Sequence, residues 1–237
     1  MKTQKRNDFI CYAFLIATLI IIHYIFVLWP DTGMLESQRA LFSWKAIGIV
    51  GLLGLASLFL LNLTGLRKLW DANVGIKQKI LYPVVAGLLL GSLHSGYDML
   101  TGAASEIAAH MGLEDIHIDF PFSIPVYLGG AILVNIIYYL IPIPILVYLV
   151  SKLIMKGKAE GIVFWTTGIL IALFEPLTNP GISVIQEVGM VVLPLSFSVL
   201  VFNLLSILFI RKYGFIASIF FRIGFYTVWH VTYPVIS

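Results

Sequence analysis

Residues 211–230 read RKYGFIASIFFRIGFYTVWH, and this stretch decides how the chain is interpreted. Two basic residues precede a tyrosine and a glycine, and an apolar run follows them. Within that run Arg222, Tyr226 and His230 are spaced i, i+4 and i+8, so a helix places them on one face. A guanidinium in the hydrocarbon layer of a membrane costs at least about 2.5 kcal/mol. Arg222 is therefore expected to face the protein interior and to have a partner there.

The composition of the whole chain is that of a membrane protein. Its 237 residues are 59% hydrophobic and 11% charged, whereas soluble domains average about 45–50% apolar and about 25% charged residues. No polar block is long enough to fold separately, so a single transmembrane domain over residues 1–237 is predicted. The net charge of +3 is carried by short loops and does not indicate nucleic-acid binding. The one cysteine, Cys11, excludes an intramolecular disulfide.

Seven apolar segments predict membrane-spanning helices, because each approaches the length needed to cross about 30 Å of hydrocarbon at 1.5 Å per residue. Pro142 and Pro144 lie inside the fourth segment and are expected to bend or break it. Asn135 or a tyrosine hydroxyl could then bond to the carbonyls that lose their donors near residues 138–140. The predicted fold is all-α, with seven transmembrane helices or eight if the fourth divides. The expected helices cover residues 9–29, 44–63, 80–100, 125–154, 161–178, 182–210 and 214–236.

The distribution of lysine and arginine predicts how the chain is oriented. If the helices alternate in direction, most basic residues fall on one side of the membrane, and the acidic segment 101–122 falls on the other. Basic loops normally stay in the cytoplasm, so the N-terminus is expected there and the C-terminus outside, in a multi-pass protein of the cell membrane. The residues predicted to be cytoplasmic are Lys2, Lys5, Arg6, Arg67, Lys68, Lys77, Lys79, Lys152, Lys156, Lys158, Arg211 and Lys212.

Polar side chains inside the apolar segments are the candidates for function, since each costs free energy in lipid. Glu175 and Arg222 carry opposite charges, and contact between them would neutralise both. Such a pair is either a packing device or part of a site. His94 and Asp98 are spaced i, i+4 and are expected to share a hydrogen bond. The full set is His23, Asn62, His94, Asp98, Asn135, Glu175, Asn203, Arg222 and His230.

A metal site on the acidic segment is a further alternative. Glu106 and His110 are spaced i, i+4, and His117 and Asp119 follow, which offers nitrogen and oxygen ligands that zinc could use. The spacing matches no established signature, and the chain contains no HExxH, GxSxG or glycine-rich phosphate loop. We therefore predict no metal cofactor, with zinc at Glu106, His110 and His117 as the alternative.

Three segments from about residue 80 onward resemble the CPBP family of CAAX proteases and bacteriocin-processing membrane proteins. They are GAILVNIIYYLIPIPILVYLVSKL at 130–153, VFWTTGILIALFEPLTNPG at 163–181 and RKYGFIASIFFRIGFYTVWHV at 211–231. The family has a helical intramembrane core and three motifs, EExxxR, FxxxH and a late HxxxN or HxxxD. The resemblance implies that residues 80–237 form this core and that residues 1–79 are a two-helix extension.

At the motif positions, this chain lacks the family's functional residues. The resemblance implies a degenerate site and a neighbouring cluster of intramembrane polar side chains. The altered motif positions are Val134, Asn135, Tyr139, Ile171, Glu175, Arg222 and Tyr226. The implied polar cluster is Asn135, Tyr139, Glu175, Arg222, Tyr226 and His230.

These replacements favour a protein without protease activity. Valine cannot act as a base, and an always-protonated arginine cannot bind a metal. The resemblance then implies that the protein binds another membrane or envelope protein, as a scaffold, regulator or immunity-type factor. One alternative is an active metallo- or glutamate-type intramembrane endopeptidase built on His94, Asp98, Glu175 or His230. Another is a small transporter or lipid-binding protein. A cavity near Arg222 would favour either alternative, whereas a packed centre would favour the first interpretation.

Overall fold

The computed structural model describes residues 2–30, 32–177 and 182–236, without the side chains of residues 2, 3, 175, 176, 182 and 183. These residues form helices and turns, and no β-strand occurs among them. Six helices are long and apolar enough to cross a membrane, and the segment expected at 161–178 corresponds to the shorter apolar helix Glu160–Phe174. The chain is a helical membrane protein, and the count of seven or eight spans stays a prediction. The six are Gln4–Leu28, Trp44–Leu61, Lys77–Thr101, Ser123–Ile154, Met190–Tyr213 and Phe215–Ile236.

Several spans consist of more than one helical element, because π-helical turns interrupt the regular α-helix. The elements in chain order are α1 Lys2–Leu28, α2 Glu36–Leu41, α3 Trp44–Leu61, η1 Lys77–Leu81, α4 Tyr82–Thr101, α5 Ala103–His110, α6 Ser123–Asn135, η2 Ile136–Leu140, α7 Pro142–Leu146, η3 Val147–Ile154, α8 Glu160–Pro176, α9 Ile182–Val188, η5 Met190–Val192, α10 Leu193–Tyr213, α11 Phe215–Tyr226, η6 Thr227–Thr232 and α12 Tyr233–Ile236.

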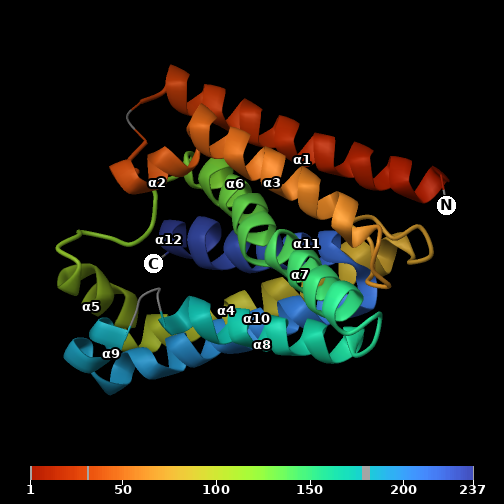
Figure 1. Ribbon diagram of the computed structural model, residues 1–237. Helices are drawn as coiled ribbons and strands as arrows, with labels where there is room; N and C mark the ends of the chain where they lie inside the picture. Colours follow the sequence, from red (N-terminus) through yellow and green to blue (C-terminus); the bar gives the residue numbers. More distant parts are fainter. Residues whose placement is uncertain (1, 31, 178–181, 237) are drawn as a thin grey trace.

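The last span occupies the centre of the bundle. The helices α1 and α3 lie side by side, α8 and α10 lie on the other side of the molecule, and α6 and α7 cross between them (Figure 1). Within the 18-residue apolar stretch of each span, 56% of the residues are buried in Phe215–Ile236, against 28% in Gln4–Leu28. The helix α11 packs against α4, α6 and α10. The predicted helical face that carries Arg222, Tyr226 and His230 therefore points into the bundle.

The basic loops gather at one end of the bundle, which we call the basic end. It holds the N-terminus, the loop 62–76, the turn after η3 and the junction of α10 with α11 (Figure 1). The helices α2, α5 and α9 lie at the opposite end. This arrangement agrees with the alternation expected from the lysines and arginines. Which side of a membrane each end faces stays a prediction.

Close contact between the backbones of α4 and α11 fixes the position of the central helix. A Cβ atom added to Gly87 would lie 2.2 Å from the carbonyl oxygen of Phe221, and one added to Gly224 would lie 2.4 Å from that of Val84. Small residues at such positions let transmembrane helices approach closely. Because Phe221 precedes Arg222 directly, this contact sets where the arginine lies along the bundle.

The two prolines of α7 interrupt the fourth span as predicted. Just before Pro142 the backbone hydrogen bonds change from the i, i+4 spacing to i, i+5. The amide of Ile141 donates to the carbonyl of Ile136 at 2.8 Å. The hydroxyl of Ser57 on α3 donates to the carbonyl of Leu140 and, at 3.1 Å, to that of Ile141. The carbonyl of Leu140, whose α-helical donor would be the missing amide of Pro144, thus bonds to a serine of another helix. At Leu140 a serine therefore takes the role expected of Asn135 or a tyrosine, and for the carbonyls of residues 138 and 139 that expectation stays a prediction.

The predicted continuous helix over residues 182–210 is wrong, because the chain leaves helical geometry at Gly189. There φ is +88° and ψ is −157°, a conformation that glycine adopts far more readily than other residues. The helix α9 ends at Val188, and α10 starts at Leu193 with Pro194 in its first turn, where proline is tolerated. The break separates a short surface helix from the membrane-spanning one.

Candidate functional site

Arg222 lies inside the bundle, with 2% of its surface exposed. Its Nη1 donates to the hydroxyl oxygen of Tyr226 at 3.0 Å, and its Nη2 donates to Oδ1 of Asn203 at 3.4 Å. The guanidinium carbon lies 4.6 Å from the ring centroid of Phe202, within the range of a cation–π contact. The predicted shared face of Arg222 and Tyr226 is confirmed, and so is the inward orientation of the arginine.

Asn203 connects four parts of the bundle. Its Oδ1 also accepts a hydrogen bond from the hydroxyl of Tyr139 at 3.1 Å, and its Nδ2 donates to the carbonyl of Ala172 at 3.5 Å. Asn203 is completely buried, so η2, α8, α10 and α11 meet at a single amide. The sequence pointed to Asn203 as a polar residue inside an apolar segment, but it gave no reason to place the residue beside Arg222.

Asn135 forms a separate buried contact. Its Nδ2 donates to the carbonyl of Ala131 at 2.8 Å, and its Oδ1 accepts from the hydroxyl of Ser218 on α11 at 2.5 Å. Val134 beside it is half-buried. These contacts join α6 to α11 one turn before Arg222, so the altered motif position Asn135 serves helix packing.

The expected contact between Glu175 and Arg222 involves a side chain outside the described residues. It is the side chain of Glu175, which belongs to the last turn of α8. One turn earlier, Ala172 contacts Asn203, which contacts Arg222. The backbone of α8 is therefore close to the arginine, and the ion pair itself stays a prediction.

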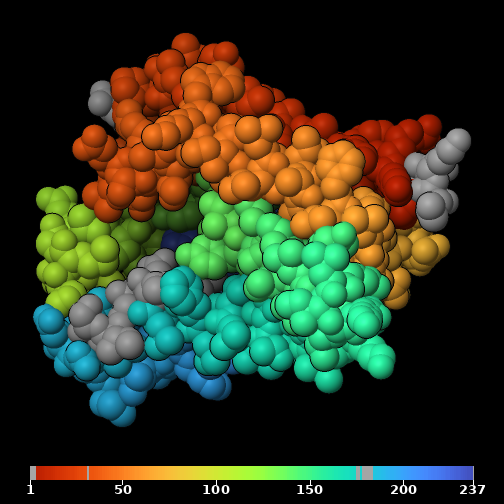
Figure 2. Space-filling model, viewed as in Figure 1, coloured from red at the N-terminus to blue at the C-terminus, as the bar shows by residue number. Residues whose placement is uncertain are grey.

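A cavity of about 330 Å³ opens beside the polar face of α11, and we call it the Arg222 cavity. Its volume falls in the range of about 300–1,000 Å³ typical of ligand sites. Figure 2 shows a hollow between α2, the segment around α5 and α6, with the C-terminal helix at its floor. The described residues around the cavity include no aspartate or glutamate. They are Leu35, Gln38, His94, Ile107, Met111, Leu113, Ile116, Tyr127, Leu195, Ser196, Val199, Phe202, Arg222, Phe225, Tyr226, Trp229 and His230.

A smaller groove lies beside the Arg222 cavity, between α6 and α11. Its volume is about 290 Å³, and it shares Tyr127 and Tyr226 with the cavity. The ring centroids of these two tyrosines are 5.8 Å apart. The other residues of the groove include Ile124, which is 48% exposed on the outside of the bundle. Two tyrosine rings therefore lie between the cavity and an exposed apolar surface formed by two apolar helices.

Histidine and aromatic rings cluster where the cavity approaches the end opposite the basic end. The Nδ1 atoms of His117 and His230 are 3.1 Å apart, so one ring donates a hydrogen bond and the other accepts it. His230 stacks on Tyr127 at 4.0 Å between centroids. The indole of Trp229 contacts His94 and His117 at 4.3 and 4.8 Å. Burial lowers the pKa of His117, which favours a neutral ring near pH 7.

Asp98 has a structural role at the start of α5. Its Oδ1 accepts from the amide of Ala104 at 2.6 Å, and its Oδ2 accepts from the hydroxyl of Tyr233 at 2.8 Å. A carboxylate at this position stabilises the N-terminus of a helix. His94 bonds through Nδ1 to the hydroxyl of Ser198. The expected hydrogen bond between His94 and Asp98 does not occur among the described contacts.

The three residues proposed as alternative zinc ligands, Glu106, His110 and His117, do not share a common partner. Nδ1 of His110 lies 3.4 Å from Oε2 of Glu187 on α9, whereas His117 contacts His230. Glu106 is exposed on α5. Among the described residues, no group of three or more histidines, cysteines, aspartates and glutamates could hold a metal ion. Glu106, His110 and His117 therefore do not form a described metal site.

Comparison of the chain with protein families, curated proteins and solved structures gives no match. The resemblance to the CPBP family rests on the three sequence segments alone, and membership of that family stays a prediction. The geometry adds that Tyr139, Arg222 and Tyr226, which come from two of those segments, are linked through the amide of Asn203 and through each other.

Proposed function

We propose that the protein is a non-catalytic membrane protein that binds an amphiphilic ligand in the Arg222 cavity. The ligand is an apolar chain with a hydrogen-bond-accepting end, such as a single-chain lipid. The observation that carries the proposal is the cavity itself, since it adjoins the polar face of α11 and is otherwise mostly apolar. A closed and packed centre would have favoured a scaffold.

The polar face of α11 suits a ligand that accepts hydrogen bonds. The oxygen of Tyr226 accepts a hydrogen bond from Arg222, so the hydroxyl's own proton is available for another acceptor. A carbonyl, carboxylate or phosphate oxygen is such an acceptor. The facing wall contains Ile107, Leu195 and Val199, which can pack along methylene groups. The groove behind Tyr127 and Tyr226 supports entry of such a ligand from the bilayer.

The described residues favour binding over peptide hydrolysis. Hydrolysis by a carboxylate base needs an aspartate or glutamate within reach of a reacting water, and none is among the described residues that line the cavity. The two histidines of the lining, His94 and His230, contact Ser198 and His117. One oxygen of Asp98 caps α5, and the other accepts a hydrogen bond from the hydroxyl of Tyr233. Arginine stays protonated and cannot replace a histidine as a base. The CPBP relation and the binding of another membrane or envelope protein rest on the sequence segments.

Photocrosslinking with a diazirine-bearing fatty acid tests the proposal. The reagent is added to membranes that contain the protein, and labelled peptides are identified by mass spectrometry. We expect labels on α10 and α11 at the cavity, above the background on lipid-facing residues such as Leu52 and Leu93, which are 72% and 73% exposed.

Two variants of α10 make this test specific. The substitution Val199→Trp fills the cavity, whereas Leu204→Trp adds the same side chain on the exposed side of the same helix. Cavity labelling should disappear in the first variant and persist in the second. Equal labelling of both, or wild-type labelling no higher at the cavity than on the lipid-facing surface, would refute a binding role.

We also propose that the basic end faces the cytoplasm, because basic loops are retained there. Single cysteines replacing Lys156 and Ser105 in a Cys11→Ala background should react with an impermeant thiol reagent from opposite sides of the membrane. Reaction of both from one side would contradict this orientation.

A further inference from the structure

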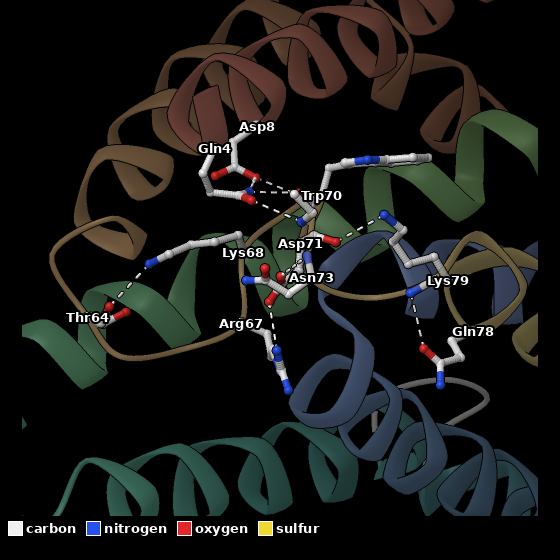
Figure 3. A network of polar contacts seen from close by, with 12 residues as sticks. Gln4, Asp8, Thr64, Arg67, Lys68, Trp70, Asp71, Asn73, Gln78 and Lys79 are labelled. Atoms are coloured by element: carbon white, nitrogen blue, oxygen red, sulfur yellow. Dashed lines mark hydrogen bonds and ion pairs between the residues drawn. The ribbon is translucent and has the colours of Figure 1, made fainter. Parts of the chain in front are cut away.

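A second hollow, of about 450 Å³, lies at the basic end, far from the Arg222 cavity along the bundle. We call it the basic pocket. Most of its lining is polar, and it contains three cationic side chains and one carboxylate. The lining residues are Gln4, Gly65, Leu66, Arg67, Lys68, Asp71, Asn73 and Arg211. They come from the start of α1, the loop 62–76 and the end of α10, and Figure 3 shows most of them with their contacts.

The loop that forms the pocket is tied firmly to α1. Nε2 of Gln4 donates to the carbonyl of Trp70 at 2.7 Å, and Oε1 of Gln4 accepts from the amide of Ala72 at 2.9 Å. The carboxylate of Asp8 accepts from the amide of Trp70, also at 2.9 Å. Figure 3 shows these side chains of α1 directed at the loop. The cations of the loop are therefore held in place before any ligand arrives.

The same loop is fixed to the central helix. The amides of Phe215 and Ile216, at the start of α11, donate to the carbonyls of Lys68 and Leu69 at 3.3 and 3.1 Å. Gly214 permits this contact, because its φ is +98° and a Cβ there would lie 2.5 Å from the carbonyl oxygen of Lys68. Arg211 therefore stays close to the loop that carries Lys68.

The cations of the pocket retain hydrogen-bonding capacity. Lys68 uses two of its three ammonium protons on the carbonyls of Leu61 and Thr64, at 2.9 and 3.2 Å. One terminal nitrogen of Arg67 pairs with Oδ2 of Asp71 at 3.0 Å, which leaves further donors on that guanidinium. Arg211 has an exposed side chain. Burial lowers the pKa of Lys68, so a bound anion would replace hydration that the ammonium has lost.

We propose that the basic pocket binds a phosphate group between Arg67, Lys68 and Arg211. Guanidinium groups match the oxygens of phosphate, and an ammonium adds a point charge. Basic pockets between transmembrane helices at the cytoplasmic side hold the head groups of anionic lipids. The phosphate can belong to such a lipid or to a soluble phosphate. This site is independent of the Arg222 cavity, and either can fail without the other.

Native mass spectrometry of the purified full chain distinguishes the two sources. One arm adds phosphatidylglycerol or phosphatidylcholine with identical acyl chains, and the other adds inorganic phosphate in phosphatidylcholine alone while thermal stability is measured. The variants are Arg211→Gln and its neighbour Lys212→Gln, which removes the same charge outside the pocket lining. The loss of one charge-assisted hydrogen bond should weaken binding about tenfold in the first variant only.

The proposal requires one of two results: phosphatidylglycerol binds in preference to phosphatidylcholine, or inorganic phosphate stabilises the protein. It also requires that Arg211→Gln reduces this effect and that Lys212→Gln does not. The first result assigns a lipid phosphate and the second a soluble one. The proposal is overturned if the two lipids bind equally and inorganic phosphate has no effect. Equal losses in the two variants would also overturn it, since they would show attraction to net charge alone.

Discussion

The contact between α4 and α11 can be tested by adding a single methyl group to Gly87. Its Cβ would lie 2.2 Å from the carbonyl oxygen of Phe221, whereas ordinary contacts start near 3.4 Å. The obstructing atom belongs to the backbone of a packed helix, so no side chain can rotate away. The two helices must separate by about 1 Å in a close-packed interior.

The expected cost follows from what overpacking does in protein cores. Inserted groups usually cost about 1–3 kcal/mol, and a clash between two backbones belongs at the upper end. For a chain of this size each kcal/mol lowers the melting temperature by about 2–4 °C. We therefore expect Gly87→Ala to lower it by roughly 6–12 °C in detergent. Labelling of the Arg222 cavity should also fall, because α11 is displaced.

Two further glycines of α4 complete the experiment. A Cβ at Gly91 would lie 2.9 Å from the carbonyl oxygen of Phe225, a milder clash, and one at Gly96 would have no neighbour within 4 Å. Alanine at Gly96 should leave stability unchanged or raise it slightly, since alanine favours helices by up to about 1 kcal/mol over glycine. The order of loss should be Gly87, then Gly91, then Gly96. A Gly87→Ala variant as stable as Gly96→Ala would refute the close contact.

Three other predictions concern buried polar groups. Replacement of Ser57 by alanine removes the donor to the carbonyl of Leu140 and should cost about 1–3 kcal/mol in chemical unfolding; an unchanged unfolding midpoint would contradict this. Because burial lowers the pKa of His117, the unfolded chain binds more protons than the folded one below about pH 6.5. The free energy of unfolding, measured as a function of pH, should therefore fall as the pH drops below that value, and it should fall less steeply in His117→Gln. Arg222→Met and Glu175→Gln should each cost about 3–5 kcal/mol, with the double variant recovering most of the loss; additive losses in the thermal cycle would show that the two side chains do not interact.

The sequence predicted the helices well wherever a segment could be judged by itself. In a membrane each span must satisfy its own backbone hydrogen bonds, so a long apolar run is enough to predict a helix. The same local reasoning placed Arg222 and Tyr226 on one face and predicted the interruption at the prolines of α7. It failed at Gly189, because an isolated glycine in an apolar run does not reveal whether its φ is positive in the folded chain.

The sequence by itself determined that the chain is a helical membrane protein with a buried arginine on its last span. Only the tertiary structure decided that Asn203 lies beside that arginine, that Ser57 bonds to the carbonyl of Leu140 freed by Pro144, and that a cavity adjoins α11. Those features depend on which helices are neighbours and in what register. Residues far apart in the chain, such as Gly87 and Phe221, set that register through contacts between helices, which the periodicity of a single segment does not encode.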